Sequence, residues 1–229
     1  MIDSYLGEGI NTWNEIPTEI GQTCSELVGY TEVGNFEAAG FTSTEEVSNY
    51  LRETIPASHL EGCPKIQYEP ITDLSCPNAL GYFRNDNHQI KILNTNQSKE
   101  QLLETLTHEV GHNAHANIME NRSDVSQRWS DIHQTSLEQY AKDGSGFVSD
   151  YARTNVYEDF AESYQSYVRD PEKLKFYNPD KFEFMRQEIF AGREYVPPIF
   201  AYLDYDSLGR QIEVTCNGTW VVATGEKIA

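Results

Sequence analysis

The 229-residue chain has few basic residues and no long apolar run. Lysine and arginine number 17 against 36 aspartates and glutamates, which gives a formal net charge of −19 at pH 7. So acidic a chain lacks the basic surface that nucleic-acid binding requires. No apolar run reaches the roughly 20 residues needed to span a bilayer. The acidic residues are spread along the chain rather than gathered in a tail, so we interpret them as a solubilising surface.

Cysteine is scarce, and its spacing excludes several kinds of site. None of the four cysteines forms a CxxC pair, so neither a zinc finger nor a thiol nucleophile is predicted. No Asp-x-Asn-x-Asp-Gly run of an EF-hand occurs either. Widely spaced cysteines in even number are consistent with two disulfides in an oxidising compartment, and four reduced thiols are the alternative. Cys-Pro at 63 and 76 frames a short loop, so of three possible pairings we expect Cys63 with Cys76 and Cys24 with Cys216.

The most informative stretch is His108-Glu109-Val110-Gly111-His112. At about 100° per residue on a helix, the two histidines point about 40° apart, so both imidazoles can reach one ion at the ~2.0–2.1 Å of zinc–nitrogen bonds. Glu109 between them is placed to act on a water bound to that ion. The pattern is typical of zinc peptidases, with Glu109 as general base. Chance alone produces it in about one chain of this length in a hundred, so the surroundings have to support it.

The flanking residues predict an amphipathic helix around this motif. Ser98 is a candidate N-cap, and Gln101 three residues later completes a capping box. Gly111 costs up to about 1 kcal/mol in a helix interior relative to alanine, and we interpret it as room for another backbone to approach closely. The apolar residues of the segment lie on the face opposite the histidines: Leu102, Leu103, Leu106 and Val110.

A catalytic zinc needs a third protein ligand, and the downstream carboxylates supply candidates. His115 lies about 10 Å along the helix from His108, too far to share an ion, so we expect it at the cleft edge or on the surface. It also stands where the metzincin pattern requires glycine, which excludes that type. Glu158 and Glu162 are one helical turn apart, and a nearby cation would relieve their repulsion. We assign Glu158 as the ligand and Glu162 as the carboxylate that orients an imidazole; an ordinary acidic helix is the alternative.

Together these residues resemble a known family of metallopeptidases. HEVGH, followed after 45 residues by Glu158 and one turn later by Glu162, is similar to the gluzincins. Tyr151, seven residues before Glu158, is similar in position to a tyrosine of the anthrax lethal factor catalytic domain and of the Pro-Pro endopeptidases. The resemblance extends from about Gly81 to Ala191. It implies a zincin-like fold, one catalytic Zn²⁺ and a Tyr151 hydroxyl that stabilises the tetrahedral intermediate, with Tyr157 as the rival for that role.

We expect an α+β fold that is mostly helical, with a small twisted sheet whose edge strand borders the cleft. The predicted parts are an N-terminal segment (1–78) packed on the core, a zincin-like catalytic core (79–192) and a C-terminal β extension (193–229), together one compact unit. Strand 89–93, second in a hairpin with 80–84, is expected to border the cleft and pair with extended substrate; a covered strand is the alternative. Helices are expected at about 43–53, 98–114, 124–133, 136–142, 156–168 and 179–191, a strand at 65–68, and a β-hairpin within 202–222.

These expectations combine into a function. We predict a zinc metalloendopeptidase, acting on a protein or peptide substrate as a monomer, without nucleic acid and without a membrane span. No basic-then-apolar signal segment begins the chain, so we interpret it as a mature form, and we predict secretion from the cysteines and the family resemblance. A non-catalytic zinc-binding domain that recognises a partner through the same cleft is the alternative, as is hydrolysis of another amide. The intact Glu109 and Tyr151 favour the enzyme, because merely holding a metal requires neither.

Overall fold

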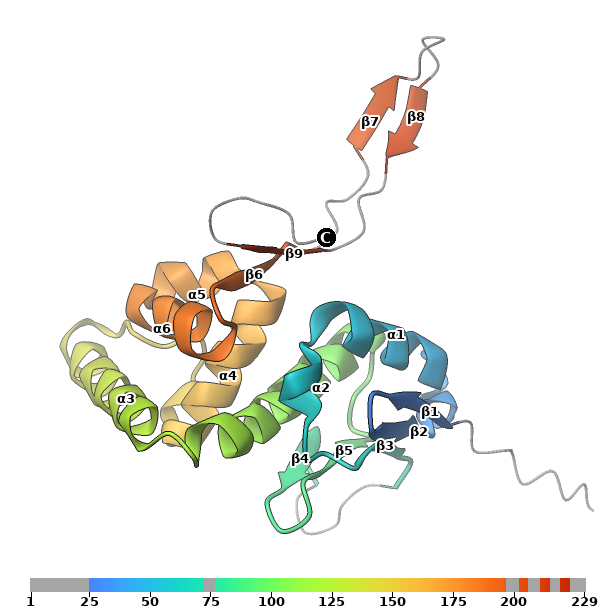
Figure 1. Ribbon diagram of the computed structural model, residues 1–229, viewed down its shortest axis with the longest axis horizontal. Coiled ribbons are helices and arrows are strands. Elements are labelled where there is room, and N and C mark those ends of the chain that lie inside the picture. Colours follow the sequence, from blue (N-terminus) through green and yellow to red (C-terminus); the bar gives the residue numbers. More distant parts are fainter. Residues whose placement is uncertain (1–24, 72–76, 197–201, 206–210, 215–218, 223–229) are drawn as a thin grey trace, which may run out of the picture.

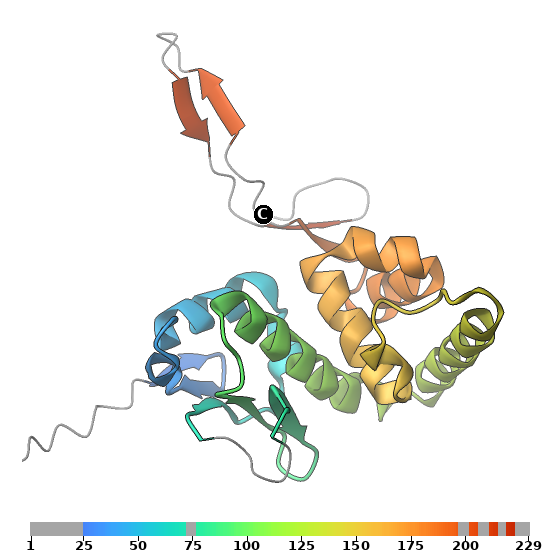
Figure 2. The same ribbon diagram turned by 180° about the vertical axis from the view of Figure 1, so that it is seen from behind.

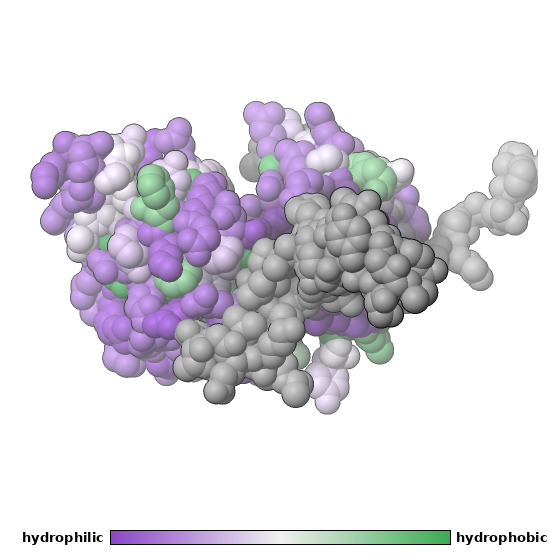
Figure 3. Space-filling model, turned by 90° about the horizontal axis from the view of Figure 1, so that it is seen from above, coloured by the Kyte–Doolittle hydropathy of each residue, from purple (hydrophilic) through white to green (hydrophobic). Residues whose placement is uncertain are grey.

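The structure is a computed structural model that describes residues 25–71, 77–196, 202–205, 211–214 and 219–222. In Figure 1 the body has two halves, a sheet covered by α1 and α2 and a group of helices α3 to α6. Seen from behind in Figure 2, α2 again lies between them. The visible surface is mostly hydrophilic (Figure 3), in keeping with the acidic composition. In the described part of the chain, no helix is both long and apolar enough to cross a membrane.

The sheet is mixed and has five strands in the order β1-β2-β3-β5-β4. Pairings β2–β3 and β3–β5 are parallel, whereas β1–β2 and β4–β5 are antiparallel. Alternate residues of the two central strands, such as Ile66 and Ile90, are fully buried under the helices, as expected where one face of a strand enters the core. The strands are β1 (Ser25–Val28), β2 (Thr31–Gly34), β3 (Lys65–Glu69), β4 (Gly81–Arg84) and β5 (Gln89–Leu93).

The position of β5 corrects one prediction and confirms another. The β4–β5 hairpin is present with its turn at 85–88, where His88 adopts a positive φ of 54°. However, β5 lies between β3 and β4, so both its edges are paired. The prediction that 89–93 borders the cleft as a free edge is therefore wrong. The outer strand on this side is β4.

The N-terminal part contributes to the same sheet, since β1, β2 and β3 precede residue 78 and join the pair β4–β5. Helix α1 (Thr44–Thr54) begins as predicted at Ser43, which forms a full capping box with Glu46. Val47 and Leu51 on its inner face are fully buried. Single helical turns flank it, η1 (Phe36–Ala39) and η2 (Ala57–Leu60).

The helical half differs from the prediction in two places. Helix α3 (Ser123–Asp143) is one helix, not the two expected at 124–133 and 136–142. No glycine or proline interrupts it. The hydroxyl of Thr135, at the expected break, donates to the carbonyl oxygen of Asp131 at 2.9 Å, so the helix continues through this residue. The expected helix 179–191 is instead α6 (Pro179–Phe184) followed by a π-helical turn, η5 (Met185–Ile189), and a further helix, α5 (Pro171–Tyr177), precedes it.

Helices α2 (Lys99–Ala114) and α4 (Val156–Arg169) form the contact between the two halves. The predicted role of Gly111 is confirmed: a Cβ there would lie 3.1 Å from the Cα of Ala161 and 3.2 Å from the Cβ of Tyr164. On its other face α2 buries Leu102, Leu106 and Val110 completely, as the helical pattern predicts.

Beyond η5 the chain forms two short antiparallel strand pairs. Strand β6 (Arg193–Val196) pairs with β9 (Thr219–Val222), and β7 (Tyr202–Tyr205) pairs with β8 (Gln211–Val214). The segment expected to hold one β-hairpin therefore contributes strands to two separate pairs. In Figure 1 the β7–β8 pair lies away from the two halves of the body.

Candidate metal centre

Helix α2 presents His108 and His112 on one side, one turn apart. Their Nε2 atoms lie 3.1 Å from each other. The helix begins as predicted, because the hydroxyl of Ser98 accepts the backbone N–H of Gln101 at 3.1 Å. The expected reciprocal bond is different: the Gln101 side chain accepts the N–H of Gln97 rather than that of Ser98.

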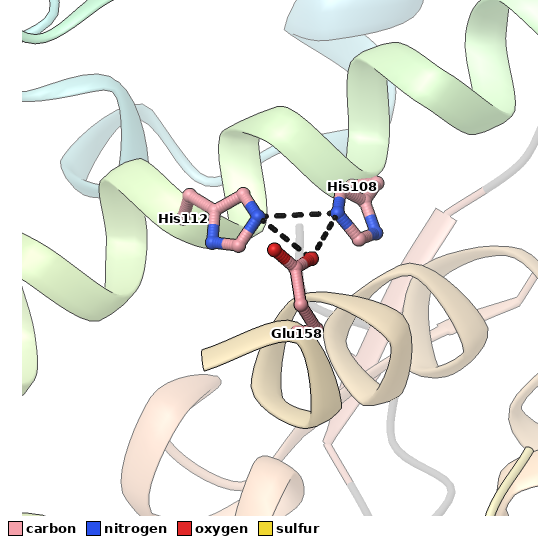
Figure 4. A group of neighbouring side chains, drawn as sticks. All are labelled: His108, His112 and Glu158. Atoms are coloured by element: carbon pink, nitrogen blue, oxygen red, sulfur yellow. Dashed lines mark hydrogen bonds and ion pairs between the residues drawn. The ribbon is translucent and has the colours of Figure 1, made fainter. Parts of the chain in front are cut away.

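Helix α4 brings a carboxylate to the two imidazoles. Its N-cap is Asn155, whose side-chain oxygen accepts the backbone N–H groups of Tyr157 and Glu158, which places Glu158 in the first turn. The Oε2 atom of Glu158 lies 3.1 Å from Nε2 of His108 and 3.3 Å from Nε2 of His112 (Figure 4). One ligand atom from each residue falls within 4.8 Å of the others, so the three predicted ligands lie together.

The charges of these groups are strongly coupled. Burial alone would lower the pKa of His108, but hydrogen bonds to Glu158 and Glu162 outweigh burial and raise that pKa to about 10. Burial alone would raise the pKa of Glu158, but the two imidazoles hold it well below its usual range. The cluster therefore attracts positive charge to its centre. Two imidazole nitrogens and one carboxylate are also a donor set that catalytic zinc uses, so these residues fit that ion.

A second carboxylate fixes the orientation of His108. The Nδ1 atom of His108 lies 2.8 Å from Oε1 of Glu162, and a proton on Nδ1 leaves the lone pair of Nε2 directed at the ligand cluster. Glu162 is held in turn by the hydroxyl of Ser149, which donates to its Oε2 at 2.5 Å and accepts the N–H of Ala152 at 3.1 Å. The predicted positioning carboxylate thus lies where that role requires it.

Glu109 is buried, 6% exposed, between α2 and the outer strand β4. Burial raises the pKa of its carboxyl, while the charged imidazoles and a hydrogen bond from the backbone of Phe83 act in the opposite direction. Strand β4 approaches closely because residue 81 is glycine: a Cβ at Gly81 would lie 2.8 Å from Cγ2 of Thr105 and 3.1 Å from Oε1 of Glu109.

Tyr151 lies on the single turn η4 (Tyr151–Arg153), and its ring centroid is 5.8 Å from that of His108. Burial and the charges of Glu158 and Glu109 raise the pKa of its hydroxyl to about 12, so the hydroxyl remains protonated, and a hydrogen-bond donor, at neutral pH. Its rival Tyr157 lies elsewhere, with its ring edge-on to His115 at 5.1 Å. His115 is no part of the ligand cluster, and it packs on Phe160 as well.

The cleft has two hollows, one on each side of the ligand cluster. The first, of about 500 Å³, is lined by His108, Glu109, Tyr151 and Glu162 together with Gly81. We call it the Glu109 side. The second, of about 360 Å³, is lined by His112, His115 and Tyr157 together with Phe83. We call it the Tyr157 side. Strand β4 contributes to both, so it runs along the cleft.

Ser149 and Gly81 are site residues that the sequence did not single out. Neither belongs to a motif, and each acts by contact with a residue far away in sequence: Ser149 through Glu162, and Gly81 through Glu109. The only sequence signal was proximity, since Ser149 precedes Tyr151 by two residues.

The cysteine predictions rest mostly on residues outside the described ranges, namely Cys24, Cys76 and Cys216. Cys63 is buried and has a free thiol, whose Sγ lies 3.6 Å from the carbonyl oxygen of Lys65. Burial raises the pKa of this thiol to about 11. The structure therefore supports no disulfide at Cys63, and the pairings stay predictions.

Comparison with known proteins agrees with this geometry. No curated protein matches the chain. A family model described as "Putative zinc-binding metallo-peptidase" matches residues 43–181, more than half of the chain, from the N-cap of α1 into α6. The match includes the two histidines, Glu109, Tyr151, Glu158 and Glu162. The chain belongs to this family of zinc-binding metallopeptidases.

Proposed function

We propose that the chain is a zinc-dependent endopeptidase in which Glu109 is the general base and His108, His112 and Glu158 hold one zinc ion. The observation that carries the proposal is the position of Glu109. Its buried carboxylate lies next to the ligand histidines and in the same hollow as the Tyr151 hydroxyl. A base and a hydroxyl donor in one hollow beside the ligand cluster are what acyl transfer needs and metal storage does not.

The mechanism assigns each step to a side chain. Bound zinc supplies a Lewis acid that acidifies water and polarises a carbonyl. Glu109 accepts the proton of the attacking water and later delivers it to the leaving amine, and a carboxyl pKa raised by burial brings this base closer to neutral pH. The Tyr151 hydroxyl donates to the oxygen of the tetrahedral intermediate, and Glu162 accepts the Nδ1–H of His108 and so keeps the Nε2 lone pair directed at the ligand cluster.

The hollows on both sides of the ligand cluster favour an endopeptidase. A peptide lying in both would continue past the reacting bond in each direction. Strand β4 is the outer strand of the sheet and contributes Gly81 to one hollow and Phe83 to the other. No other described strand pairs with its outer edge, so this edge can pair with an extended substrate. This role falls to β4 rather than to β5.

Two finer features are part of the proposal. We propose the gluzincin type, with the orienting carboxylate Glu162 one turn after Glu158, because both lie on α4 and reach His108 from two sides. We also propose that the protein is secreted and acts as a monomer. Thiol titration of the unfolded protein tests the cysteine argument for secretion: four reactive thiols would contradict it.

The function is tested with purified protein and casein or a random peptide library, with and without a chelator. Cleavage that the chelator abolishes and added zinc restores is expected. Glu109→Ala should retain about one zinc per chain while losing cleavage, whereas Glu138→Ala, an exposed glutamate on α3, should behave like the wild type. Full activity in Glu109→Ala would overturn the mechanism. Zinc binding without cleavage of any peptide would favour a recognition domain.

A further inference from the structure

We infer that the Tyr157 side of the cleft selects a large apolar side chain on the N-terminal side of the scissile bond, with Tyr157 as a specificity-determining residue. This inference rests on the proposed endopeptidase function and goes beyond it by naming the substrate class. It follows from three features of the structure: the side on which Glu109 lies, the side chains that line the opposite hollow, and the exposure of Tyr157.

The position of Glu109 fixes the direction of the substrate. The leaving amine belongs to the residue after the scissile bond, and it has to receive its proton from Glu109. Glu109 and Tyr151 line one hollow and are absent from the other. The C-terminal part of the substrate therefore occupies the Glu109 side, and the N-terminal part occupies the Tyr157 side.

Strand β4 is consistent with this direction. Gly81, its first residue, lies on the Glu109 side, and Phe83 lies on the Tyr157 side. A substrate whose N-terminal part lies beside Phe83 and whose C-terminal part lies beside Gly81 runs antiparallel to β4. Antiparallel pairing with a strand edge is a geometry that gives regular main-chain hydrogen bonds.

The wall of the Tyr157 side is mixed, with Asn85, Glu120, Ser126 and Ser130 beside a group of apolar side chains. Directly after α2, the chain forms a π-helical turn, η3 (His115–Met119), and π-helical turns often occur at functional sites. Three residues of this turn line the hollow, namely His115, Ala116 and Met119. The remaining apolar lining comes from β4, α3 and the start of α4: Phe83, Trp129, Val156 and Tyr157.

Several polar groups of this hollow are already satisfied. The indole N–H of Trp129 donates to the carbonyl of Val156 at 3.0 Å, and the hydroxyl of Ser130 donates to the carbonyl of Ser126 at 3.0 Å. The one carboxyl of the lining belongs to the exposed Glu120. An acidic substrate side chain would be repelled by this carboxylate, whereas a leucine or phenylalanine would bury apolar surface against Phe83 and Tyr157.

The opposite hollow lacks this aromatic wall. Away from the catalytic groups, the Glu109 side is lined by the polar side chains of Asn78, Gln101, Glu104 and Gln165 and by Ala79 and Leu80. Among the described residues its one phenyl-type ring is that of Tyr151, so selection by aromatic side chains is inferred for the N-terminal side alone.

Tyr157 forms the outer wall of the hollow that bears its name. It is 56% exposed although it is a large aromatic residue, it is adjacent in sequence to the ligand Glu158, and its ring lies edge-on to His115. An exposed aromatic ring at the mouth of a hollow gains buried area when an apolar side chain enters. Because Tyr157 is half exposed, removing its ring does not empty the core.

The test compares quenched fluorescent peptides that differ only at the two positions before the cleaved bond. In the wild type, kcat/KM for phenylalanine or leucine at one of these positions should exceed that for glycine or aspartate by at least about tenfold, a typical size for selection by an apolar pocket. Tyr157→Ala should lose most of this preference, because kcat/KM falls much further for the phenylalanine and leucine peptides than for the glycine peptide, and Tyr157→Phe should keep it. Tyr30→Ala, which removes a fully exposed ring on the β1–β2 turn, is the matched control.

Peptide binding provides a readout that does not depend on turnover. Calorimetry on zinc-loaded Glu109→Ala should give tighter binding of the phenylalanine peptide than of the glycine peptide, and adding Tyr157→Ala should remove the difference. Unchanged zinc content and melting temperature in Tyr157→Ala would exclude a folding defect. Indifference of both cleavage and binding to these positions would overturn the inference, as would an equal loss for all peptides in Tyr157→Ala. Loss of all cleavage with selective binding retained would contradict the proposed function alone.

Discussion

Gly111 of α2 and Ala161 of α4 lie so close that a methyl group on Gly111 would come within 3.1 Å of the Ala161 Cα atom. This contact joins the helix that carries His108 and His112 to the helix that carries Glu158 and Glu162. The distance between the metal ligands therefore depends on the absence of a side chain at position 111. The glycine inside the HEVGH motif serves packing, as Val110 does, while His108, Glu109 and His112 are the residues proposed to serve chemistry.

We expect Gly111→Ala to destabilise the protein and weaken zinc binding together. Alanine is the better helix former, but overpacking against a backbone atom typically costs about 1–3 kcal/mol, and separating the helices moves Glu158 away from the imidazoles. Urea denaturation and competition with a chelating dye measure the two effects. Gln127→Ala on the exposed face of α3 is a control that should change neither. A more stable Gly111→Ala protein with unchanged zinc affinity would contradict this account.

Ser149→Ala should weaken zinc binding although Ser149 is no ligand. Its hydroxyl holds Glu162, which in turn orients His108, and loss of such supporting groups typically costs about 10–100-fold in metal affinity or activity. Ser149→Thr keeps a hydroxyl and should retain much of the function. The measurement is zinc affinity at equilibrium, together with kcat at saturating zinc. Equal affinities for wild type and Ser149→Ala would show that Glu162 needs no support from this residue.

Zinc binding should release about one proton per chain near pH 7.5. In the absence of zinc the pKa of His108 is raised to about 10, so this imidazole is protonated at neutral pH, whereas a ligand imidazole has to be neutral. Zinc affinity should accordingly rise about tenfold for each unit of pH between about 6 and 9. Calorimetry in buffers of different ionisation enthalpy counts the protons directly. A binding enthalpy independent of the buffer would contradict protonation of His108.

The sequence predicted the site better than it predicted the groups that support it. The site residues form two pairs with a helical spacing of four residues, His108 with His112 and Glu158 with Glu162. This spacing alone places each pair on one face of a helix. Ser149 could not be predicted in this way, because its hydrogen bond to Glu162 spans 13 residues that include the turn η4 and the start of α4, and no single periodicity covers that span. The contact of Glu109 with the edge strand depends likewise on tertiary packing.

The starts of α1 and α2, which depend on local capping and periodicity, were predicted correctly. The strand order of the sheet, which depends on tertiary pairing, was not. Ser43 and Ser98 cap their helices because the signal is local. The place of β5 inside the sheet was missed, since strand order depends on β3, whose residues pair with those of β5 from 24 residues away. The π-helical turns after α2 and α6 have no simple sequence signal either, although one of them shapes the Tyr157 side.

Acid should destabilise the fold through His59, a buried histidine outside the site. Its ring nitrogens lie 2.8 Å from the Tyr164 hydroxyl and 3.1 Å from the carbonyl oxygen of Ile189, and burial lowers its pKa to about 4. The unfolded chain, with a histidine pKa of about 6.5, then binds the proton more tightly, so stability is full above about pH 6.5 and falls towards pH 4. The expected loss is on the order of 3 kcal/mol. Urea denaturation of the wild type and of His59→Gln at several pH values measures it, and identical pH slopes in the two proteins would contradict the assignment.

Lys181 should be essential for stability because it neutralises a buried carboxylate. Its side chain is fully buried, with Nζ 2.7 Å from Oδ1 of Asp159 and 2.9 Å from the carbonyl oxygen of Gly146. Lys181→Met leaves the charge of Asp159 with His133 as its one remaining ionic partner in the described part of the chain, and removing one partner of a buried pair typically costs about 3–5 kcal/mol. The double variant Lys181→Met/Asp159→Asn removes both charges and should recover part of that loss. A double-mutant cycle from urea denaturation measures the coupling, and additive losses without recovery would show that the ion pair is not what stabilises this part of the fold.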